Sequence, residues 1–137
     1  MKIVITGSNG FIGKTLFDYY SEKKNVVLGL NSKTYKLYKN GTIEKGNYNS
    51  FLDFDIKDFD IVYHFGWSGT AGREDRSNWK LQLSNLEFSL KFYTFCSEQN
   101  INNFVYSASV YENEVISDLF FPEKPKVNCL TNVYGAA

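Results

Sequence analysis

The stretch with the clearest chemical potential is a glycine turn near the start of the chain, ITGSNGFIG at residues 5–13. Its three glycines follow a run of β-formers and precede an apolar helical pattern. A dinucleotide pyrophosphate binds at a helix N-terminus with free amides, and it needs a backbone without Cβ atoms so that the phosphates can approach. Glycines at this spacing also occur in plain turns, but a strand before them and a helix after them favour a dinucleotide site. The cofactor-binding residues predicted here are Gly7, Ser8, Asn9, Gly10, Phe11, Ile12 and Gly13.

The residues at the end of the second predicted strand bear on which dinucleotide would bind. In a dinucleotide site of this type, an acidic residue at this point accepts hydrogen bonds from the adenosine ribose hydroxyls. This chain has Asn31, followed by Ser32 and Lys33. A carboxylate would repel a 2′-phosphate, whereas a neutral amide beside a hydroxyl and an ammonium can receive one. We therefore predict a preference for NADP over NAD, the alternative being that Lys33 is a solvated loop charge.

These residues need a scaffold, and the apolar pattern predicts alternating strands and helices. We expect strands at residues 2–6, 25–31, 60–65 and 103–109, with a weaker one at 42–47. We expect helices at 11–23 and 77–100, a short helical turn at 50–57 and the start of a helix at 132–137. The polar and basic stretch 32–40 and the stretch 66–76 are expected to be loops. Apolar strands alternating with helices predict an α/β fold, a Rossmann-like doubly wound parallel sheet covered on both faces.

Composition limits the class of protein. The chain has 137 residues with 43% hydrophobic content, enough for one domain over residues 1–137 with its own core. The net charge is zero, so no basic stripe predicts nucleic acid as a partner. Cys96, Cys129 and His64 lack the spacing of a zinc site, so no metal is expected. Without a signal peptide or an 18-residue apolar span, the sequence predicts a cytoplasmic protein that does not enter a membrane.

Five motifs, in order along the chain, carry a resemblance to a known family. They are TGSNGFIG at 6–13, DIVYHFGW at 60–67, QLSNLEFSLKF at 82–92, FVYSAS at 104–109 and VYGAA at 133–137. Together they resemble the extended short-chain dehydrogenase/reductases, and more narrowly the NAD-dependent epimerase/dehydratase group that acts on nucleotide sugars. The resemblance implies that the chain holds the cofactor-binding N-terminal part and lacks the C-terminal substrate-binding region.

The resemblance also implies catalytic roles for two residues. Tyr134 corresponds to the family's general base and Ser109 to the hydroxyl that hydrogen-bonds the reacting sugar oxygen. A phenol acts as a base near pH 7 only if its pKa is lowered from about 10, and in the family a Lys four residues after the Tyr does this. That Lys would stand directly after Ala137, so the chain as given is expected to be inactive by itself.

Further cofactor contacts are implied by position in the family motifs. They lie at the ends of strands and in the long helix, and they are Asn47, Phe65, Gly66, Trp67, Asn85 and Ser107. Asn47 stands where the family usually has an Asp near the adenine, which again leaves NAD or NADP open. His64 lies in an apolar strand and is interpreted as a core or cofactor-wall residue rather than a catalyst.

The long helix has two apolar stripes. We expect Leu83, Leu86, Leu90 and Tyr93 to face the sheet, which leaves Leu81, Phe88, Phe92 and Phe95 as a second stripe. A second apolar face needs a second partner, and in the resembling family this helix pairs with its copy. A homodimer of the full-length protein is therefore expected through the second stripe.

The function that follows is an NAD(P)-dependent epimerase, dehydratase or reductase acting on a nucleotide sugar. A place in polysaccharide biosynthesis is what the resemblance implies. The alternative is a non-catalytic NAD(P)-binding module or sensor, which would have no need of both Ser109 and Tyr134.

Overall fold

The computed structural model describes residues 1–70 and 72–107. It divides the chain into two compact units. Residues 1–66 and 90–106 form the first unit, and the described part of the second is residues 67–70, 72–89 and 107. The expected catalytic residues Ser109 and Tyr134 and the helix start at 132–137 lie outside the described residues.

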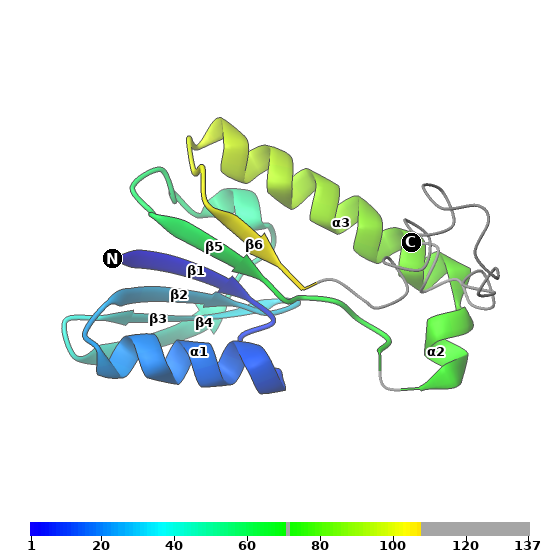
Figure 1. Ribbon diagram of the computed structural model, residues 1–137, viewed down its shortest axis with the longest axis horizontal. Coiled ribbons are helices and arrows are strands. Elements are labelled where there is room, and N and C mark those ends of the chain that lie inside the picture. The colour runs from blue at the N-terminus through cyan, green and yellow to red at the C-terminus, as the bar shows by residue number, and fades with distance from the viewer. Residues whose placement is uncertain (71, 108–137) are drawn as a thin grey trace, which may run out of the picture. The chain divides into compact units, whose positions relative to one another are not determined.

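The first unit is built on a six-stranded sheet with the order β4-β3-β2-β1-β5-β6 (Figure 1). The strands are β1 (Lys2–Thr6), β2 (Val26–Leu30), β3 (Thr34–Lys39), β4 (Thr42–Asn47), β5 (Ile61–His64) and β6 (Phe104–Tyr106). β1 pairs in parallel with both β2 and β5, and β5 pairs in parallel with β6. The α/β class and the Rossmann-like core of the sheet are therefore confirmed.

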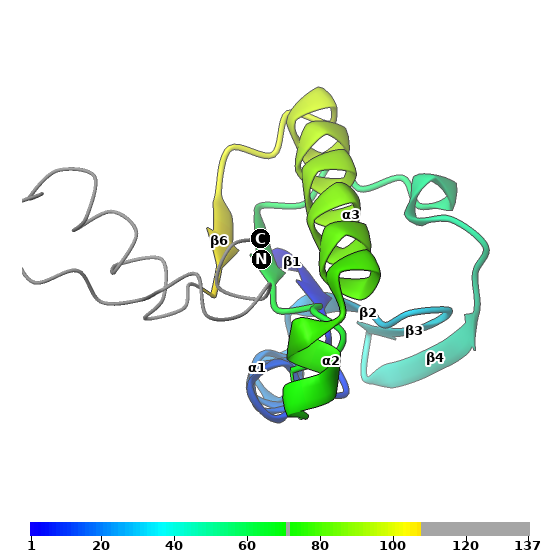
Figure 2. The same ribbon diagram turned by 90° about the vertical axis from the view of Figure 1, so that its right-hand side faces the viewer.

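Helices lie on both faces of this sheet. Helix α1 (Phe11–Glu22) connects β1 to β2 and buries Phe17 against Ile3, Ile5 and Val27. The C-terminal part of α3 (Trp79–Glu98) lies on the opposite face, as Figure 2 shows. A central strand with helices on both faces must be apolar on both, and Ile3, Val4 and Ile5 are all fully buried. The short connection before β5 contains one 3-10 turn, η1 (Phe51–Asp53), capped by Ser50.

The predicted loop at 32–40 is wrong, because this stretch forms β3. β3 runs antiparallel to β2 and β4, so the sheet is mixed rather than wholly parallel. The β3–β4 connection is Asn40-Gly41, with φ values of 54° and 84°. Asn-Gly with two positive φ values is the commonest sequence for a tight hairpin turn. The lysines in β3 make this strand difficult to recognise in the sequence, because they give the segment the polarity of a loop. In the sheet, a lysine can bury its aliphatic stem while its ammonium stays in a polar environment.

The expected faces of the long helix are also reversed. Phe92 is fully buried and Phe95 is 7% exposed, and both rings contact Phe51 in the first unit. Leu90 and Tyr93, which were expected to face the sheet, are 59% and 56% exposed. Both stripes are apolar, so spacing alone does not say which one packs. Phe92 packs on β5 and β6, where its ring contacts both His64 and Phe104.

The second unit contains α2 (Arg73–Ser77) and the N-terminal part of α3. Asn78 lies between the two helices, and its side chain accepts the amide of Leu81 at the start of α3. In residues 1–70 and 72–107, no helix is both long enough and apolar enough to cross a bilayer.

Candidate dinucleotide-binding site

The glycine turn connects β1 to α1 and is held close to its neighbours by backbone hydrogen bonds. Gly7 has φ 67°, and its amide donates to the carbonyl of Leu30 at 2.8 Å. A Cβ on Gly7 would lie 2.8 Å from the carbonyl oxygen of Phe65, and a Cβ on Gly13 would collide with the carbonyl of Gly7. Gly7 therefore permits the turn and its packing on β5, and Gly13 permits close packing of helix on turn.

Gly10 is different from the other two glycines of the turn. Its φ is −73°, which any residue adopts, and the residue is exposed. A Cβ here would meet only the Gly7 carbonyl oxygen, at 3.2 Å, so an alanine would fit after a small shift. The chain's own packing thus gives little reason for glycine at this position. A ligand that must come close to the backbone gives one.

The first turn of α1 is free to receive an anion. Its N-cap is Gly10, which makes no side-chain cap, and no acidic side chain lies in the first turn. The first amides of an α-helix have no carbonyl four residues back, and they carry the positive end of the helix dipole. Phe11 is 92% exposed and Ile12 is 51% exposed, so neither side chain is packed into the core at this end of the helix. The residues present therefore fit a pyrophosphate at this helix end.

Asn31 lies against the glycine turn. Its Oδ1 accepts the amide of Asn9 at 3.0 Å, and its Nδ2 donates to Ser8 Oγ at 3.1 Å. Ser8 is fully buried, above Gly29 of β2, where any Cβ would lie 2.5 Å from the Ser8 hydroxyl oxygen. The Asn31 side chain therefore ties the end of β2 to the glycine turn, and its predicted contact with the adenosine of a cofactor stays a prediction.

Lys36 of β3 also contacts the turn, and no motif in the sequence marks it as a site residue. Its Nζ donates to the carbonyl of Ser8 at 2.9 Å and lies 4.1 Å from the centre of the Phe17 ring. Burial lowers the pKa of Lys36 below its usual range. The signal that could have found this residue is the Asn-Gly hairpin, which predicts β3 beside β2.

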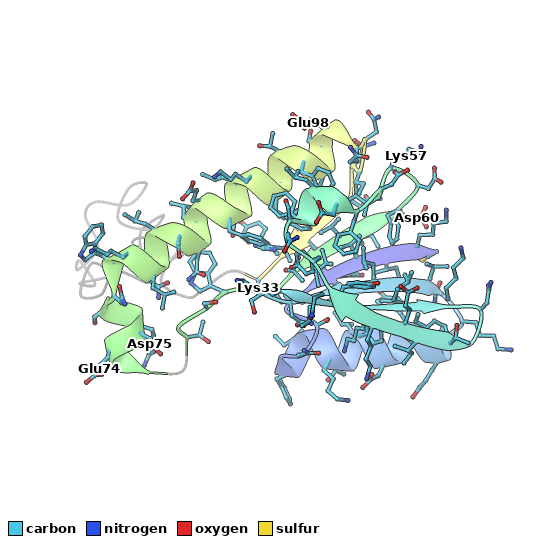
Figure 3. The ribbon with its side chains drawn as sticks, turned by 180° about the vertical axis from the view of Figure 1, so that it is seen from behind. Lys33, Lys57, Asp60, Glu74, Asp75 and Glu98 are labelled. Atoms are coloured by element: carbon cyan, nitrogen blue, oxygen red, sulfur yellow. The ribbon has the colours of Figure 1, made fainter. Side chains whose placement is uncertain are left out.

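Ser32, Lys33 and Asn47 lie where the predicted adenosine end of the site would be. All three are exposed, Ser32 and Lys33 in the connection between β2 and β3 (Figure 3) and Asn47 at the end of β4. Tyr48 closes this region, because its hydroxyl donates to the Asn31 carbonyl and its amide to the Lys33 carbonyl at 3.0 Å. Burial raises the pKa of Tyr48, so it remains a neutral donor.

The carboxyl ends of β1 and β5 are joined through one hydroxyl group. Thr6 Oγ1 accepts the amides of Phe65 and Gly66 at 3.1 and 2.9 Å and lies 2.7 Å from His64 Nδ1. With both lone pairs of Thr6 occupied, its proton must go to Nδ1, so His64 is neutral with its other nitrogen protonated. Burial lowers the pKa of His64 to about 4, in agreement with this state. His64 is thus a buried core residue, in agreement with its interpretation from the sequence, and it orients the Thr6 hydroxyl that holds the Phe65 and Gly66 amides.

In the second unit, two buried amides of α3 hold the segment that follows Gly66. Gln82 Oε1 accepts the Trp67 indole N–H at 2.7 Å, and its Nε2 donates to the carbonyl of Asp75 at 3.0 Å. Asn85 bonds both backbone groups of Ser68, at 3.0 and 2.8 Å. The Asn85 side chain therefore positions this loop, and its polar atoms already have partners within the chain. Gln82, which no sequence motif marks as a site residue, does the same for Trp67. Ser107 is exposed directly after β6.

A parallel core of strands with a glycine turn at the carboxyl end of β1, leading into an open helix N-terminus, defines a Rossmann-type dinucleotide-binding fold. The profile of the NAD dependent epimerase/dehydratase family matches residues 3–136. The chain belongs to this family, as the five motifs predicted.

Comparison with solved structures shows that the chain shares its fold with part of a larger enzyme. The chain is similar to the UDP-N-acetylglucosamine 4-epimerase of Bacillus cereus, with a TM-score of 0.62 and 19% sequence identity. The match covers 99% of this chain and 45% of that enzyme, so the chain spans less than half of its length. At this identity the likeness shows the fold. No curated protein matches the sequence.

Proposed function

We propose that this chain is the cofactor-binding part of an NAD(P)-dependent enzyme that modifies a nucleotide sugar. The observation that carries the proposal is Gly10, an exposed glycine that the chain itself does not need, at the open N-terminus of α1. Gly7, Ser8, Asn9, Gly10, Phe11, Ile12 and Gly13 would surround the pyrophosphate, and Asn31 with Ser32, Lys33 and Asn47 the adenosine.

The remaining residues of the proposed cofactor site come from the end of β5 and beyond. Phe65 and Gly66 would line the nicotinamide side. Trp67, Asn85 and Ser107 are proposed as further cofactor contacts from their positions in the family motifs. NADP is the expected cofactor over NAD. The family membership itself supports an NAD-dependent protein.

Calorimetric titration of the chain with NADH and NADPH tests cofactor binding. A ligand that binds only the folded state stabilises it by RT ln(1 + [L]/Kd), which is about 2.7 kcal/mol at a hundredfold excess over Kd. We expect heat of binding and a rise in Tm with at least one of the two. No heat and no rise in Tm with either cofactor would contradict the proposal.

For the chemistry, we propose Tyr134 as general base and Ser109 as the donor that polarises the reacting sugar oxygen. A bound nicotinamide would accept the hydride that leaves the sugar carbon. Tyr134 would take the proton from the sugar hydroxyl, while Ser109 holds that oxygen in place. Cytoplasmic location and polysaccharide biosynthesis stay predictions.

Tyr134→Phe distinguishes this enzyme from a non-catalytic NAD(P)-binding module or sensor. When the unaltered protein turns over a nucleotide sugar, Tyr134→Phe should lower kcat by about 10²-fold or more, the scale of general-base catalysis. NADH affinity, measured in the same variant, should not change. Full turnover in Tyr134→Phe would refute the assignment of the base.

A further inference from the structure

Lys36 places a cation at the adenosine side of the glycine turn. It comes from β3, opposite Gly29 of β2, and its stem passes over the position where Gly29 has no side chain. Its ammonium reaches the Ser8 carbonyl at 2.9 Å. Ser8 is also the residue whose hydroxyl Asn31 holds. Lys36 and Asn31 therefore converge on the same residue of the turn.

This cation has no carboxylate partner in residues 1–70 and 72–107. The ion pairs formed there involve Lys2, Lys14 and Lys57. Asp18, the carboxylate whose charge acts on Lys36, is itself paired with Lys14. An ammonium that is half-buried and unneutralised attracts an anion more strongly than a solvated lysine does.

The ammonium also has donors to spare. Lysine carries three N–H donors, and the Ser8 carbonyl takes one of them. The Phe17 ring lies on another side of the charge, 4.1 Å from Nζ to the ring centre. By contrast, Lys33 is exposed in the connection after β2, with only its carbonyl held, by the Tyr48 amide.

In a dinucleotide site of this fold, the ribose 2′-hydroxyl lies at the residue that ends β2. That residue is Asn31, whose side chain contacts Ser8, and the ammonium of Lys36 donates to the carbonyl of the same Ser8. We propose that Lys36, rather than Lys33, is the residue that receives the 2′-phosphate of NADPH and sets the preference for NADPH over NADH. This inference rests on the proposed function, because it assigns a group of the cofactor to one residue of the site.

The test is calorimetric titration of NADPH and NADH into the wild-type chain, Lys36→Met, Lys33→Met and Lys39→Met. Methionine keeps most of the lysine stem and removes the charge. A charge-assisted contact corresponds to roughly ten- to hundredfold in affinity. We expect the wild type to prefer NADPH by about that factor, and Lys36→Met to lose the preference while its NADH affinity stays within about twofold. Lys33→Met removes the rival cation and should keep the preference, and Lys39→Met, at an exposed lysine of β3 outside the proposed site, is the matched control that should bind both cofactors like the wild type.

A further variant keeps the test decisive if Lys36→Met does not fold. Lys36→Arg retains the charge and should bind NADPH with most of the wild-type preference, because Arg also binds phosphate. Retained NADH binding serves as the check on folding in every variant.

The outcomes separate the two proposals. If the wild type binds neither cofactor, the proposed function fails and this inference falls with it. If it binds both equally, or if Lys33→Met rather than Lys36→Met removes the preference, the assignment of Lys36 is overturned while dinucleotide binding stands.

Discussion

Two glycines of the same turn have different reasons to be glycine. For Gly10 the chain's own contacts are mild, since an added Cβ lies 3.2 Å from one carbonyl oxygen, whereas a Cβ on Gly13 overlaps that same oxygen. Gly10→Ala should therefore change the free energy of unfolding by less than about 1 kcal/mol, the scale of an N-cap exchange. It should still weaken NADH binding by about tenfold or more, because the methyl group occupies space that the phosphates need.

Gly13→Ala is the matched control for this prediction. It should lower the free energy of unfolding by about 1–3 kcal/mol, because the helix must move away from the turn. Urea denaturation and calorimetry with NADH measure the two effects separately. If Gly10→Ala binds NADH as tightly as the wild type, the pyrophosphate does not lie against this residue.

The protonation of His64 predicts how stability depends on pH. Burial lowers the pKa of His64 to about 4, from 6.5 in an unfolded chain. The unfolded state therefore binds a proton first as pH falls, so stability from this residue is complete above pH 6.5 and is lost progressively down to about pH 4. The loss over this window is on the order of 3 kcal/mol.

A histidine-free variant isolates this contribution. His64→Gln keeps a polar side chain of similar reach and does not titrate between pH 4 and 6.5. Its free energy of unfolding, from urea titrations at several pH values, should fall less steeply than that of the wild type in this window. Parallel pH profiles for the two proteins would show that His64 is protonated in the folded state as easily as in the unfolded one.

At the scale of elements, helix α3 offers a contrast between its two faces. Phe92 is fully buried against His64 and Phe104, and Leu90, two residues away, is 59% exposed. Phe92→Ala should cost about 3–5 kcal/mol, the usual range for a buried aromatic side chain. Leu90→Ala should stay within about 0.5 kcal/mol, as surface substitutions do.

Urea denaturation of both variants checks this prediction. If Phe92→Ala leaves too little folded protein to measure, Phe92→Leu makes the same comparison at lower cost. A larger loss for Leu90→Ala than for the Phe92 variant would mean that the originally expected face packs on the sheet.

The strands show which parts of the fold a sequence can predict. β1, β2 and β5 are continuous apolar runs because they are buried on both faces, and they were predicted within one or two residues. β3 carries two lysines among tyrosines and a leucine and lies between β2 and the edge strand β4, where the stem of a lysine can pack along the sheet. Its polarity favoured a loop in the sequence. The Asn40-Gly41 pair is a local signal strong enough to correct that interpretation.

The candidate site follows the same division. The spacing of the glycines predicts the tight turn between β1 and α1, because the backbone geometry seen at Gly7 and Gly13 is encoded locally, while its cofactor role stays a prediction. Lys36 and Gln82 act through contacts with residues 28 and 15 positions away, respectively. The Asn-Gly hairpin predicts that β3 lies beside β2, but it does not predict that the Lys36 side chain reaches Ser8. The faces of α3 were reversed for a related reason: both stripes are apolar, and the choice between them depends on tertiary contacts such as those of Phe92 with His64 and Phe104.

At the scale of the whole molecule, the exposed stripe of α3 bears on assembly. Leu83, Leu90 and Tyr93 are each at least half exposed, and their spacing places them on one side of the helix. An apolar stripe of this length on a surface helix usually has a partner. We propose this stripe as the surface for the expected homodimer, in place of the stripe of Phe92 and Phe95, which is buried in the chain's own core.

Leu90→Lys tests this assembly in the full-length protein. Because Leu90 is exposed within the chain, the charge should leave the fold of the monomer intact while opposing burial of the stripe against a second copy. We expect light scattering to give a dimer mass for the unaltered protein and a monomer mass for Leu90→Lys at the same concentration. Lys91→Ala, a change at the neighbouring exposed position, is the control that should remain dimeric. A dimer that survives Leu90→Lys would place the interface elsewhere, and a monomeric unaltered protein at high concentration would rule out the homodimer.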